Sequence, residues 1–467
     1  MVATITAEMK KRFIDDFKLD ADSSAIRYYI GISRSEDWND SDTAPSPVNT
    51  EREQRDFRHG LQSVKEVTNF SFVIPRVNWT SGTTFAAYSD TVVAHPTVAY
   101  YAMIESNQVY VCLRQGTNAA GVAQPSTVAP GGTTNISFTT ADGYAWKFLY
   151  SIGTLDAAAF KSANFIPVKL QGATTGSSPA TDVEQLAIQV AAIPGRQIVG
   201  FSLDSGGAGY TSNPTVTITG DGHVGSTGGA KASAIQSGGS IVKIVLDDDS
   251  AAAPNAIRMG QGFNYASIVL SGGGSPTTIA TGKAIFGPKA GFGADPTDDL
   301  RARALMFNAK PVGTEGGEFI VGNSFRQIGL LRNPTDSAGG LFTDDDGNAL
   351  RRIELASDAT AAFTPRAIIT GSTSGAKAFV DSHNDSDEIH YHQTEATGFT
   401  EFQEGETVED TGGGSGTTQA AGTDADAFAF IEPKVDKYSG DLMYIENRAA
   451  VTRAADQTED IKVIIEI

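Results

Sequence analysis

The sequence predicts a mostly β protein, a layered β-sandwich with a few short helices and two inserted small β modules. Three observations favour this class. Glycine accounts for 50 of the 467 residues, and it supplies the positive φ that tight turns need. Short apolar segments alternate with turn signals at regular spacing, which is typical of antiparallel sandwiches. Helical periodicity is scarce by comparison.

Two short helices are expected near the N-terminus. The first covers residues 6–17, with Thr6 as its N-cap. Ile14 lies beside an apolar stripe at four-residue spacing, formed by Met9, Phe13 and Phe17. We expect this stripe to pack on its own domain, with a partner chain as the alternative. The second helix is expected over residues 54–67, and one of its faces carries Phe57, Leu61 and Val64.

Short strands are expected wherever runs of β-branched and aromatic residues lie between turn signals. In the first third of the chain they cover residues 26–33, 69–74, 91–94, 98–104, 109–113, 135–138 and 145–152. A last strand begins at Ile461, with Val463 and Ile465 on the same face. Because Ile464 interrupts the opposite, polar face, this strand is predicted to be buried on both sides, near the middle of a sheet.

The middle of the chain contains an internal repeat. Residues 206–220 are echoed by residues 260–272, and residues 230–234 by residues 280–285. A further strand, over residues 239–246, lies between the copies. Each copy consists of a Gly-x-Gly-aromatic turn followed by an alternating strand, so two stacked copies bury a core that one copy could not.

The net charge of -20 argues against a nucleic-acid partner, because phosphates require a basic footprint. The sequence has neither an apolar run long enough to span a membrane nor a secretory apolar segment. We therefore expect no membrane partner and maturation in a cytoplasm. The single cysteine, Cys112, lies in an apolar strand-like run and is expected to be a small buried hydrophobe rather than a nucleophile.

The C-terminal region carries the most specific motif. It reads Ser439-Gly-Asp-Leu-Met-Tyr-Ile-Glu-Asn-Arg448, then Asp456-Gln-Thr-Glu-Asp-Ile461. This resembles the C-terminal signature of the baseplate wedge subunit, protein 8, of T4-like contractile-tailed phages. Similar matches recur in order along the chain: Tyr29-Ile-Gly-Ile-Ser-Arg-Ser-Glu-Asp-Trp38, Val73-Ile-Pro-Arg-Val-Asn-Trp79, Tyr110-Val-Cys-Leu113, Asp142-Gly-Tyr-Ala-Trp-Lys-Phe-Leu149 and Phe325-Arg-Gln-Ile328.

The resemblance implies a structural protein of a myovirus virion, located in the tail baseplate and assembled in the host cytoplasm. It would form a homodimer and contact neighbouring wedge proteins, in assembly and in a rearrangement triggered by host attachment. The implied role is not enzymatic. We assign no catalytic, cofactor-binding or metal-binding residue and expect no cofactor.

The resemblance also divides the chain into five parts. Residues 1–171 would form the N-terminal part of the wedge β-sandwich core, continued by residues 299–365 and by C-terminal core strands over residues 428–467. Residues 172–298 would form an inserted Gly-rich β-repeat domain. Residues 366–427 would form a second inserted β module, similar to small β-barrel-like insertions of tail proteins. In this module, residues 411–418 are expected to be a flexible loop tip.

Two groups of residues could form a metal site, a pair of histidines and two acidic motifs, but each also has a structural explanation. His390 and His392 share a face of a predicted strand and could bind a metal with His383 or Asp385. The favoured interpretation is that they are solvated histidines on an exposed face. Calcium is a weak alternative at Asp344-Asp-Asp-Gly-Asn348 or Asp247-Asp-Asp249, because the ligand spacing is wrong and turn chemistry explains the first motif equally well.

Other catalytic or phosphate-binding motifs are not supported by the sequence. The Gly-rich segments that begin at Gly206, Gly260 and Gly291 lack the Lys-Ser/Thr of a phosphate-binding loop. Several charged and aromatic residues in the matched segments are expected to hold loops on the sandwich rather than to contact partners, namely Arg34, Glu36, Trp38, Arg76, Trp79, Glu446 and Arg448.

The alternative function is a carbohydrate-binding or adhesin-like tail module. It is suggested by the Gly-rich repeat and by three aromatic residues that follow its turns, Tyr210, Phe263 and Tyr265. The same residues would equally well cap the fold of the repeat.

Overall fold

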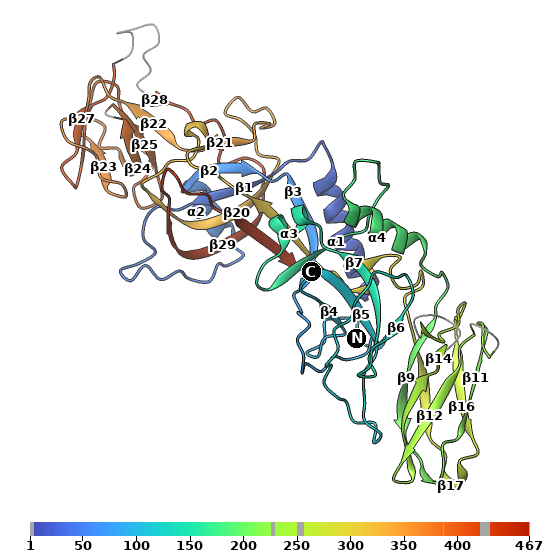
Figure 1. Cartoon of the computed structure of the whole chain (residues 1–467). Helices are drawn as coiled ribbons and strands as arrows, with labels where there is room; N and C mark the ends of the chain where they lie inside the picture. The colour runs from blue at the N-terminus through green and yellow to red at the C-terminus, as the bar shows by residue number, and fades with distance from the viewer. Residues whose placement is uncertain (1–3, 226–228, 250–255, 386, 421–429, 467) are drawn as a thin grey trace. The chain divides into compact units, whose positions relative to one another are not determined.

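The computed structural model describes residues 4–225, 229–249, 256–385, 387–420 and 430–466. It confirms a mostly β protein in which antiparallel sheets are accompanied by short helices (Figure 1). The chain forms two compact units, each assembled from separate segments. The first unit comprises Met1–Ile14, Ser71–Met306 and Ile465–Ile467, and the second comprises Asp15–Phe70 and Phe307–Ile464.

The helices of the described residues are short. They are α1 (Ala7–Asp22), α2 (Glu51–His59), α3 (Thr154–Phe160), α4 (Ala180–Val190), α5 (Pro296–Asp299) and the 3-10 helix η1 (Glu315–Gly317). Across the same residues, no helix combines the length and the apolar character needed to cross a membrane. The sequence patterns did not predict α3 or α4.

Helix α1 begins after Thr6, whose hydroxyl oxygen accepts a hydrogen bond from the amide of Met9 at 3.3 Å. The predicted N-cap is therefore confirmed. The helix continues past Phe17 to Asp22. Ile14 is buried, but Met9 and Phe13 are 49% and 45% exposed. The prediction that the whole stripe packs on its own domain is wrong for these two residues.

Only the first part of the second predicted helix, residues 54–59, is helical. Helix α2 is capped by the Thr50 side chain, ends at His59 and gives way after Gly60 to strand β2 (Leu61–Glu66). Phe57, Leu61 and Val64 still share one core, because a helical turn followed by a strand brings them to the same side. Residues 61–66 form a strand rather than a helix because their backbone pairs with β1 (Tyr28–Ser33) on one side and β21 (Asp346–Asn348) on the other.

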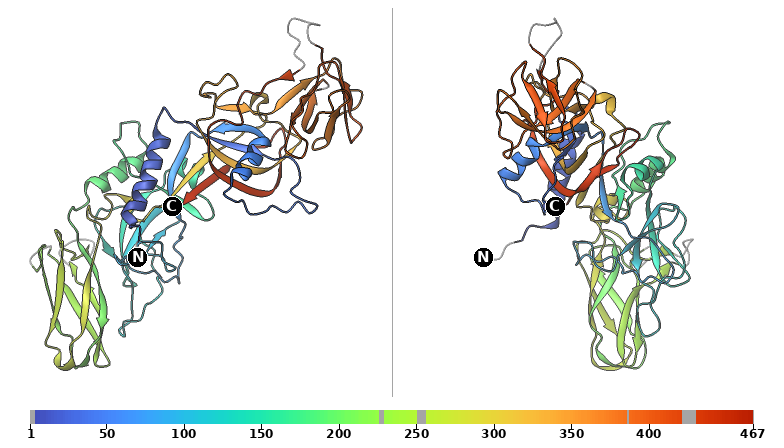
Figure 2. Two further views of the ribbon diagram at one scale, coloured as in Figure 1. Left: turned by 180° about the vertical axis from the view of Figure 1, so that it is seen from behind. Right: turned by 90° about the vertical axis from the view of Figure 1, so that its left-hand side faces the viewer.

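Two four-stranded sheets contain strands of the first unit (Figure 2). One has the order β4-β5-β7-β6, from β4 (Tyr101–Met103), β5 (Gln108–Arg114), β7 (Ala145–Ser151) and β6 (Phe138–Thr139). Its aromatic core includes Tyr110, Trp146 and Phe148, with Cys112 buried among them as predicted. The other has the order β30-β19-β3-β8, from β30 (Ile461–Glu466), β19 (Ala304–Ala309), β3 (Asn69–Pro75) and β8 (Phe165–Val168).

Three strand predictions need correction. Of residues 135–138, only Phe138 lies in a strand, β6. Residues 91–94 form no strand, and the carbonyls of Ala94 and of nearby Ser89 accept hydrogen bonds from the Arg301 side chain. The C-terminal strand β30 is an edge strand of its sheet rather than a central one. Ile461 and Val463 are buried, while Ile464 is half-buried.

The repeat forms a module of paired copies, here called the repeat module (residues 198–286). One sheet has the order β13-β12-β11-β16, and β9 pairs with β18 beside it. Short pairs β10–β17 and β14–β15 complete it. The strands are β9 (Ile198–Ser205), β10 (Ala208–Tyr210), β11 (Thr215–Gly220), β12 (Ala232–Ser237), β13 (Ser240–Leu246), β14 (Asp248–Asp249), β15 (Ala256–Ile257), β16 (Ala266–Ser271), β17 (Gly274–Thr278) and β18 (Thr281–Phe286).

The two copies of the repeat are intertwined. The equivalent strands β11 and β16 pair with each other across the copies. Strand β13, expected to lie between the copies, is the counterpart of β9: it pairs with β12 of the first copy, just as β9 pairs with β18 of the second. Each copy therefore completes the sheet of the other, which explains why one copy could not bury the core alone.

Two further sheets consist of strands of the second unit. The first has the order β21-β2-β1-β20-β29, with β20 (Ser324–Arg332) and β29 (Asp441–Thr452). The second has the order β27-β26-β23-β24-β25-β22-β28, from β27 (Ser415–Thr417), β26 (Thr407–Asp410), β23 (Ile368–Gly371), β24 (Lys377–Asp385), β25 (Glu388–His392), β22 (Arg351–Glu354) and β28 (Phe430–Ile431). We call β23–β27 the second module.

The predicted flexible tip at residues 411–418 is largely ordered structure. Strand β27 pairs with β26, and Thr418 is fully buried. The turn itself is confined to residues 411–414, where Gly413 has a φ of 99°. Glycine composition indicated flexibility here, but the residues are used for one tight turn.

We expect the first unit to fold without the repeat module. Ile198 and Phe286 are cross-strand partners, so deleting residues 199–285 leaves ends about 5 Å apart, which a direct junction can close. The deletion removes hydrogen bonds of Lys243 with Gln115 and Thr117, and of Ile257 with Ser137. It also removes the contacts of Arg114 with Leu246 and Asp248, but Arg114 retains its bonds to Thr139 and Gly143. Circular dichroism should show one cooperative thermal transition for the first unit. Loss of near-ultraviolet signal in a soluble product would show that the module is part of the main core.

Candidate functional site

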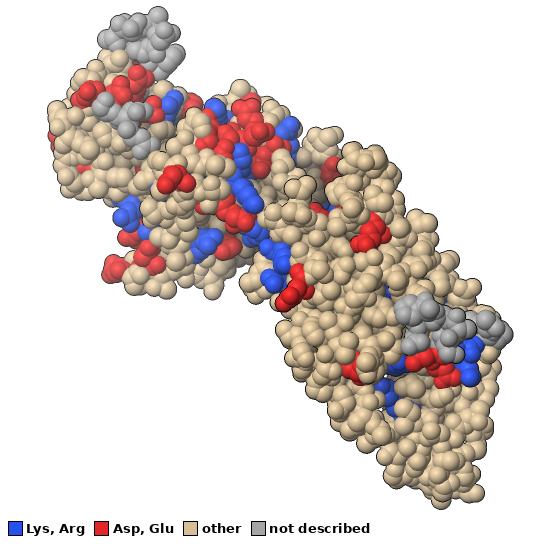
Figure 3. All heavy atoms as spheres, viewed as in Figure 1, with Lys and Arg blue, Asp and Glu red and all other residues tan. Residues whose placement is uncertain are grey.

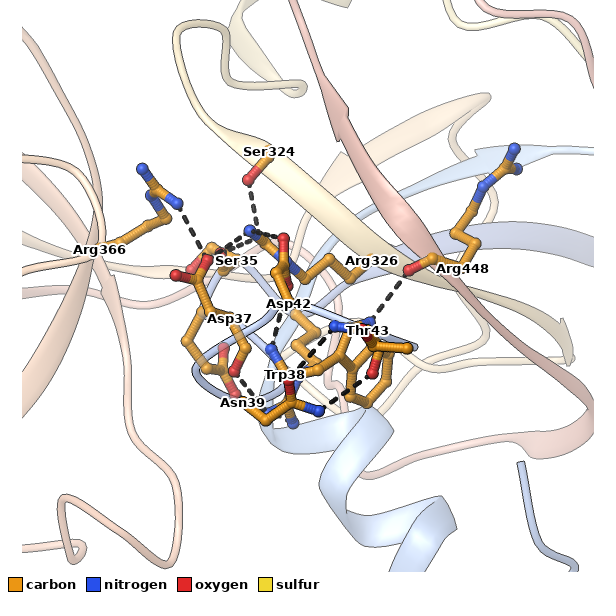
Figure 4. A network of polar contacts seen from close by, with 12 residues as sticks. Ser35, Asp37, Trp38, Asn39, Asp42, Thr43, Ser324, Arg326, Arg366 and Arg448 are labelled. Atoms are coloured by element: carbon orange, nitrogen blue, oxygen red, sulfur yellow. Dashed lines mark hydrogen bonds and ion pairs between the residues drawn. The ribbon is translucent and has the colours of Figure 1, made fainter. Parts of the chain in front are cut away.

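Arg326 is a buried cation at the centre of the second unit. It lies on β20 and its side chain is only 2% exposed. Its guanidinium binds Asp42 through two parallel contacts, from Nε to Oδ1 at 2.7 Å and from Nη2 to Oδ2 at 2.8 Å. It also binds Asp37 Oδ1 at 2.5 Å and the carbonyl of Ser35 (Figure 4). Such a fork-to-carboxylate arrangement is strong and directional.

The carboxylates reach Arg326 because the intervening loop (residues 34–43) is folded by its own side chains. Asp42 accepts a hydrogen bond from the amide of Trp38 at 3.1 Å, and Asn39 accepts one from the amide of Ser41 at 3.0 Å. The hydrogen bond from Arg326 holds the pKa of Asp42 below its usual range, against the opposing effect of burial. The loop thus supplies the two carboxylates that pair with the buried Arg326.

The predicted loop-holding residues are confirmed in this role for Arg34 and Trp38. The indole Nε1 of Trp38 donates to the carbonyl of Arg448 at 3.0 Å, and the Arg34 guanidinium lies 4.3 Å from the indole centre. Arg448 contributes its backbone rather than its side chain (Figure 4). Glu446 accepts a hydrogen bond from the hydroxyl of Tyr444 at 3.1 Å. In the first unit, Arg76 binds Asn78 and Ser162, and Trp79 binds Ser126.

A second set of charges, the His392 cluster, connects the same loop to the second module. His392 Nδ1 lies 2.6 Å from Asp381 Oδ2, and His392 Nε2 lies 3.3 Å from Glu36 Oε2. The side chains of His392 and Asp381 are fully buried. Arg34 lies 3.3 Å from the other oxygen of Glu36. At the exposed edge of the loop, Arg366 binds Asp37 at 3.0 Å.

The two carboxylates keep the imidazole of His392 protonated. Burial alone would lower its pKa, but Asp381 and Glu36 raise it to about 9. Burial would likewise raise the pKa of Glu36, but His392 and Arg34 lower it to about 2. A protonated imidazole has no free lone pair, so at neutral pH it can neither accept a proton from a substrate nor bind a metal. The cluster is suited to holding segments together.

The expectation that His390 and His392 are solvated is wrong, because both are buried. His390 Nδ1 lies 3.1 Å from the hydroxyl of Ser382. His383 Nδ1 accepts the amide of Phe363 at 3.3 Å, so it does not join them. The side chain of Asp385 lies outside the described residues. Within those residues, no group of three or more potential ligands is arranged to hold a metal ion.

Carboxylates of both acidic motifs are ion-paired with basic side chains of the same chain. Asp346 is ion-paired with Lys65 at 3.2 Å and lies in strand β21, so the predicted Asp-Gly-Asn turn is wrong. Asp247 and Asp248 pair with Lys231 and Arg114 at 3.2 and 2.8 Å; the side chain of Asp249 is outside the described residues. Near Gly291, the amide of Gly293 donates to the buried Asp299 carboxylate at 2.6 Å.

Sequence reasoning did not single out Arg326, Asp381, Asp37 or Asp42. A signal was available for Arg326, because it is a cation within the run Ser324–Arg332, whose other residues are compatible with a buried strand. A buried cation requires anionic partners. Nothing in the sequence identified which of the 55 acidic residues would supply them.

No protein-family model matches this chain, and a search of curated proteins returns no match.

Replacing Arg326 with Met should destabilise the second unit. The variant leaves Asp37 and Asp42 facing each other without their cation. We expect the free energy of unfolding to fall by about 3 kcal/mol, the lower end of the range for breaking a buried pair, because Asp37 is half exposed. Hydrogen exchange of residues 28–43 and 324–332 measures the change. The matched control is Arg366→Met, which removes an exposed partner of Asp37 and should cost less than about 1 kcal/mol. Equal effects of the two variants would contradict a central role for Arg326.

His392 should make stability depend on alkaline pH. Its folded pKa of about 9 lies above the usual value of 6.5, so its contribution is complete below pH 6.5 and is lost as the pH rises through 9. The lowered pKa of Glu36 acts in the opposite range, below pH 4.5. We expect the stability advantage of the wild type over His392→Gln to shrink by about 3 kcal/mol between pH 6.5 and 9. Urea denaturation of both proteins across this range measures it, and a constant difference would refute a protonated His392.

Proposed function

We propose that this chain is a structural subunit of a contractile phage tail, a baseplate wedge protein of the protein 8 type. It would act through protein–protein contacts in baseplate assembly and in the rearrangement that follows host attachment. The proposal begins from the resemblance of its ordered motifs to that family. Its support in the structure is the position of those motifs relative to one another within each unit.

The observation that carries the proposal is the sheet β2-β1-β20-β29. Three motifs with the family resemblance, which begin at Tyr29, Phe325 and Ser439, are far apart in sequence. Their strands β1, β20 and β29 are adjacent and antiparallel, with Gly31 opposite Gly329 and Leu330 opposite Tyr444. Segments that resembled the family only by chance would not be expected to lie on adjacent strands of one sheet. In the first unit, the motifs containing Tyr110 and Trp146 likewise lie on the paired strands β5 and β7.

The two parts without family resemblance differ in how their strands are paired. The repeat module pairs its strands internally, and the second module extends the sheet that contains β22 and β28. The Arg326 network and the His392 cluster hold the second module on the framework of the second unit through Glu36 and Asp37. A subunit that transmits a rearrangement between neighbours must itself remain rigid, and buried ion pairs of this kind serve that need.

The proposed homodimer and wedge contacts require exposed apolar surface. Helix α1 supplies one such surface in the first unit, where Met9 and Phe13 are exposed together with Ile5. Met9 and Phe13, four residues apart, lie on one side of α1, and Ile5 lies just before the helix. The acidic net charge gives no support to a nucleic-acid partner. On the face in Figure 3, acidic and basic side chains are interspersed over the second unit, and uncharged residues dominate the repeat module.

The carbohydrate-binding alternative at the repeat module gains no specific support. Tyr210 and Phe263 are buried, and the Tyr210 hydroxyl accepts the amide of Ala280 at 2.9 Å. These two residues cap the fold of the repeat. Tyr265 is 65% exposed, and one aromatic ring is a weak basis for a sugar site.

The proposal is tested in the particles of the phage that encodes this chain. Tails are purified before and after contraction, their protein content is measured by mass spectrometry, and a tag inserted at Ala396, in an exposed turn, is located by electron microscopy. We expect the chain in the baseplate in a sixfold ring, at equal abundance in extended and contracted tails. Absence from purified particles would refute a structural role, and labelling at fibre tips would favour the adhesin alternative.

A further inference from the structure

A pocket of about 240 Å3 opens in the second unit beside the His392 cluster. It lies where β22, β25, the segment after β25 and the segment before β29 converge. The proposed scaffold function makes no use of it. Its volume is sufficient for a group of the size of one sugar ring or one large side chain.

Two exposed aromatic rings form one wall. Phe399 and Tyr438 are 51% and 54% exposed, and both rest edge-on against the His59 ring, at centroid distances of 5.0 and 5.8 Å. Because His59 is buried, it fixes both rings from behind. Large exposed rings held in place beside a cavity are typical of ligand-binding surfaces.

Lys437 supplies a cation to the same pocket. Among the described residues, its hydrogen bond goes to the carbonyl of His59 at 3.0 Å, and an ammonium carries three donors. Burial lowers the pKa of Lys437 to about 8, against the opposing effect of Asp381, Asp436 and Glu432. A bound carboxylate would accept a further hydrogen bond from the ammonium.

The remaining lining offers both donors and acceptors. Arg351 lies at the rim, 3.5 Å from Glu401, whose side chain is 76% exposed. Tyr391 and Gln393 also line the pocket, and the side-chain nitrogen of Gln393 donates to the carbonyls of Lys377 and Thr400. Sugar hydroxyls donate and accept at once, so a mixed lining suits them better than it suits a purely apolar acid.

We propose that this pocket binds an acidic sugar, a pyranose with a carboxylate. Lys437 pairs with the carboxylate, Phe399 and Tyr438 contact the apolar face of the ring, and Glu401 and Arg351 bind its hydroxyls. Acidic sugars are components of polysaccharide surfaces. Binding here would give the chain a ligand in addition to its protein neighbours.

The test uses the full chain and monosaccharide probes. Glucuronate, glucose and acetate are compared by saturation-transfer NMR and titration calorimetry. We expect glucuronate to bind with a Kd on the order of 1 mM, the range for a ligand of this size. Glucose and acetate should each bind at least tenfold more weakly. Equal binding of acetate would overturn sugar recognition, equal binding of glucose would overturn the role of the carboxylate, and no binding of glucuronate would overturn the site.

Two variants test which side chains contact the carboxylate and the ring of the sugar. Lys437→Met should weaken glucuronate binding at least tenfold while leaving the weak glucose signal unchanged. Phe399→Leu changes an exposed ring that supports no core and should weaken glucuronate and glucose alike. The matched control is Lys434→Met, three positions away, whose ammonium pairs with Glu318 outside this pocket. Loss of binding in the control, or retention in both pocket variants, would overturn the assignment.

Discussion

The second unit depends on the burial of one guanidinium. Arg326 lies in the middle of a five-stranded sheet, where an isolated charge would cost far more than the chain could sustain. The cost is offset because the loop after β1 returns two carboxylates and a carbonyl to the same point. Once the loop is fixed in this way, Glu36 is placed against His392, and Trp38 is placed against β29. The position of the second module therefore follows from a charge in another sheet.

The same sheet depends on the absence of side chains at one point. Gly31 and Gly329 face each other on β1 and β20, and the ring of Phe57 occupies the space that a Cβ on Gly329 would need. A Cβ on Gly31 would lie 2.8 Å from Leu61. The pair of glycines lets helix α2 approach the sheet closely, so that a helix and the strand after it share one core. Here glycine is required for close packing rather than for a turn.

Much of the fold was predictable from local patterns, and the failures have identifiable causes. Alternation and turn signals located β1, β3, β5, β7 and β13 within a residue or two. The pattern of Phe57, Leu61 and Val64 fits a helix as well as a helix followed by a strand, and only pairing with β1 decides between them. Residues 91–94 have strand composition, but they form no strand, and the carbonyl of Ala94 accepts a hydrogen bond from the distant Arg301. For the site, the charged and aromatic residues of the loop were recognised as structural. Their partner Arg326 was not, because its ion pairs with Asp42 and Asp37, 284 and 289 positions away, leave no local signal. Asp381 was also missed, although it pairs with His392 only 11 positions away.

The intertwined repeat has a consequence for how the chain emerges from the ribosome. Strand β9 cannot find its partner until β18 has been synthesised, and their cross-strand pairs join residues as far apart as Ile198 and Phe286. Pairing of such high contact order closes a long loop and is correspondingly slow. The first copy therefore spends the interval with unpaired strand edges, in which it can exchange strands with another nascent chain as readily as with its own second copy. Strand exchange between neighbouring chains on one messenger is therefore a folding hazard built into the repeat.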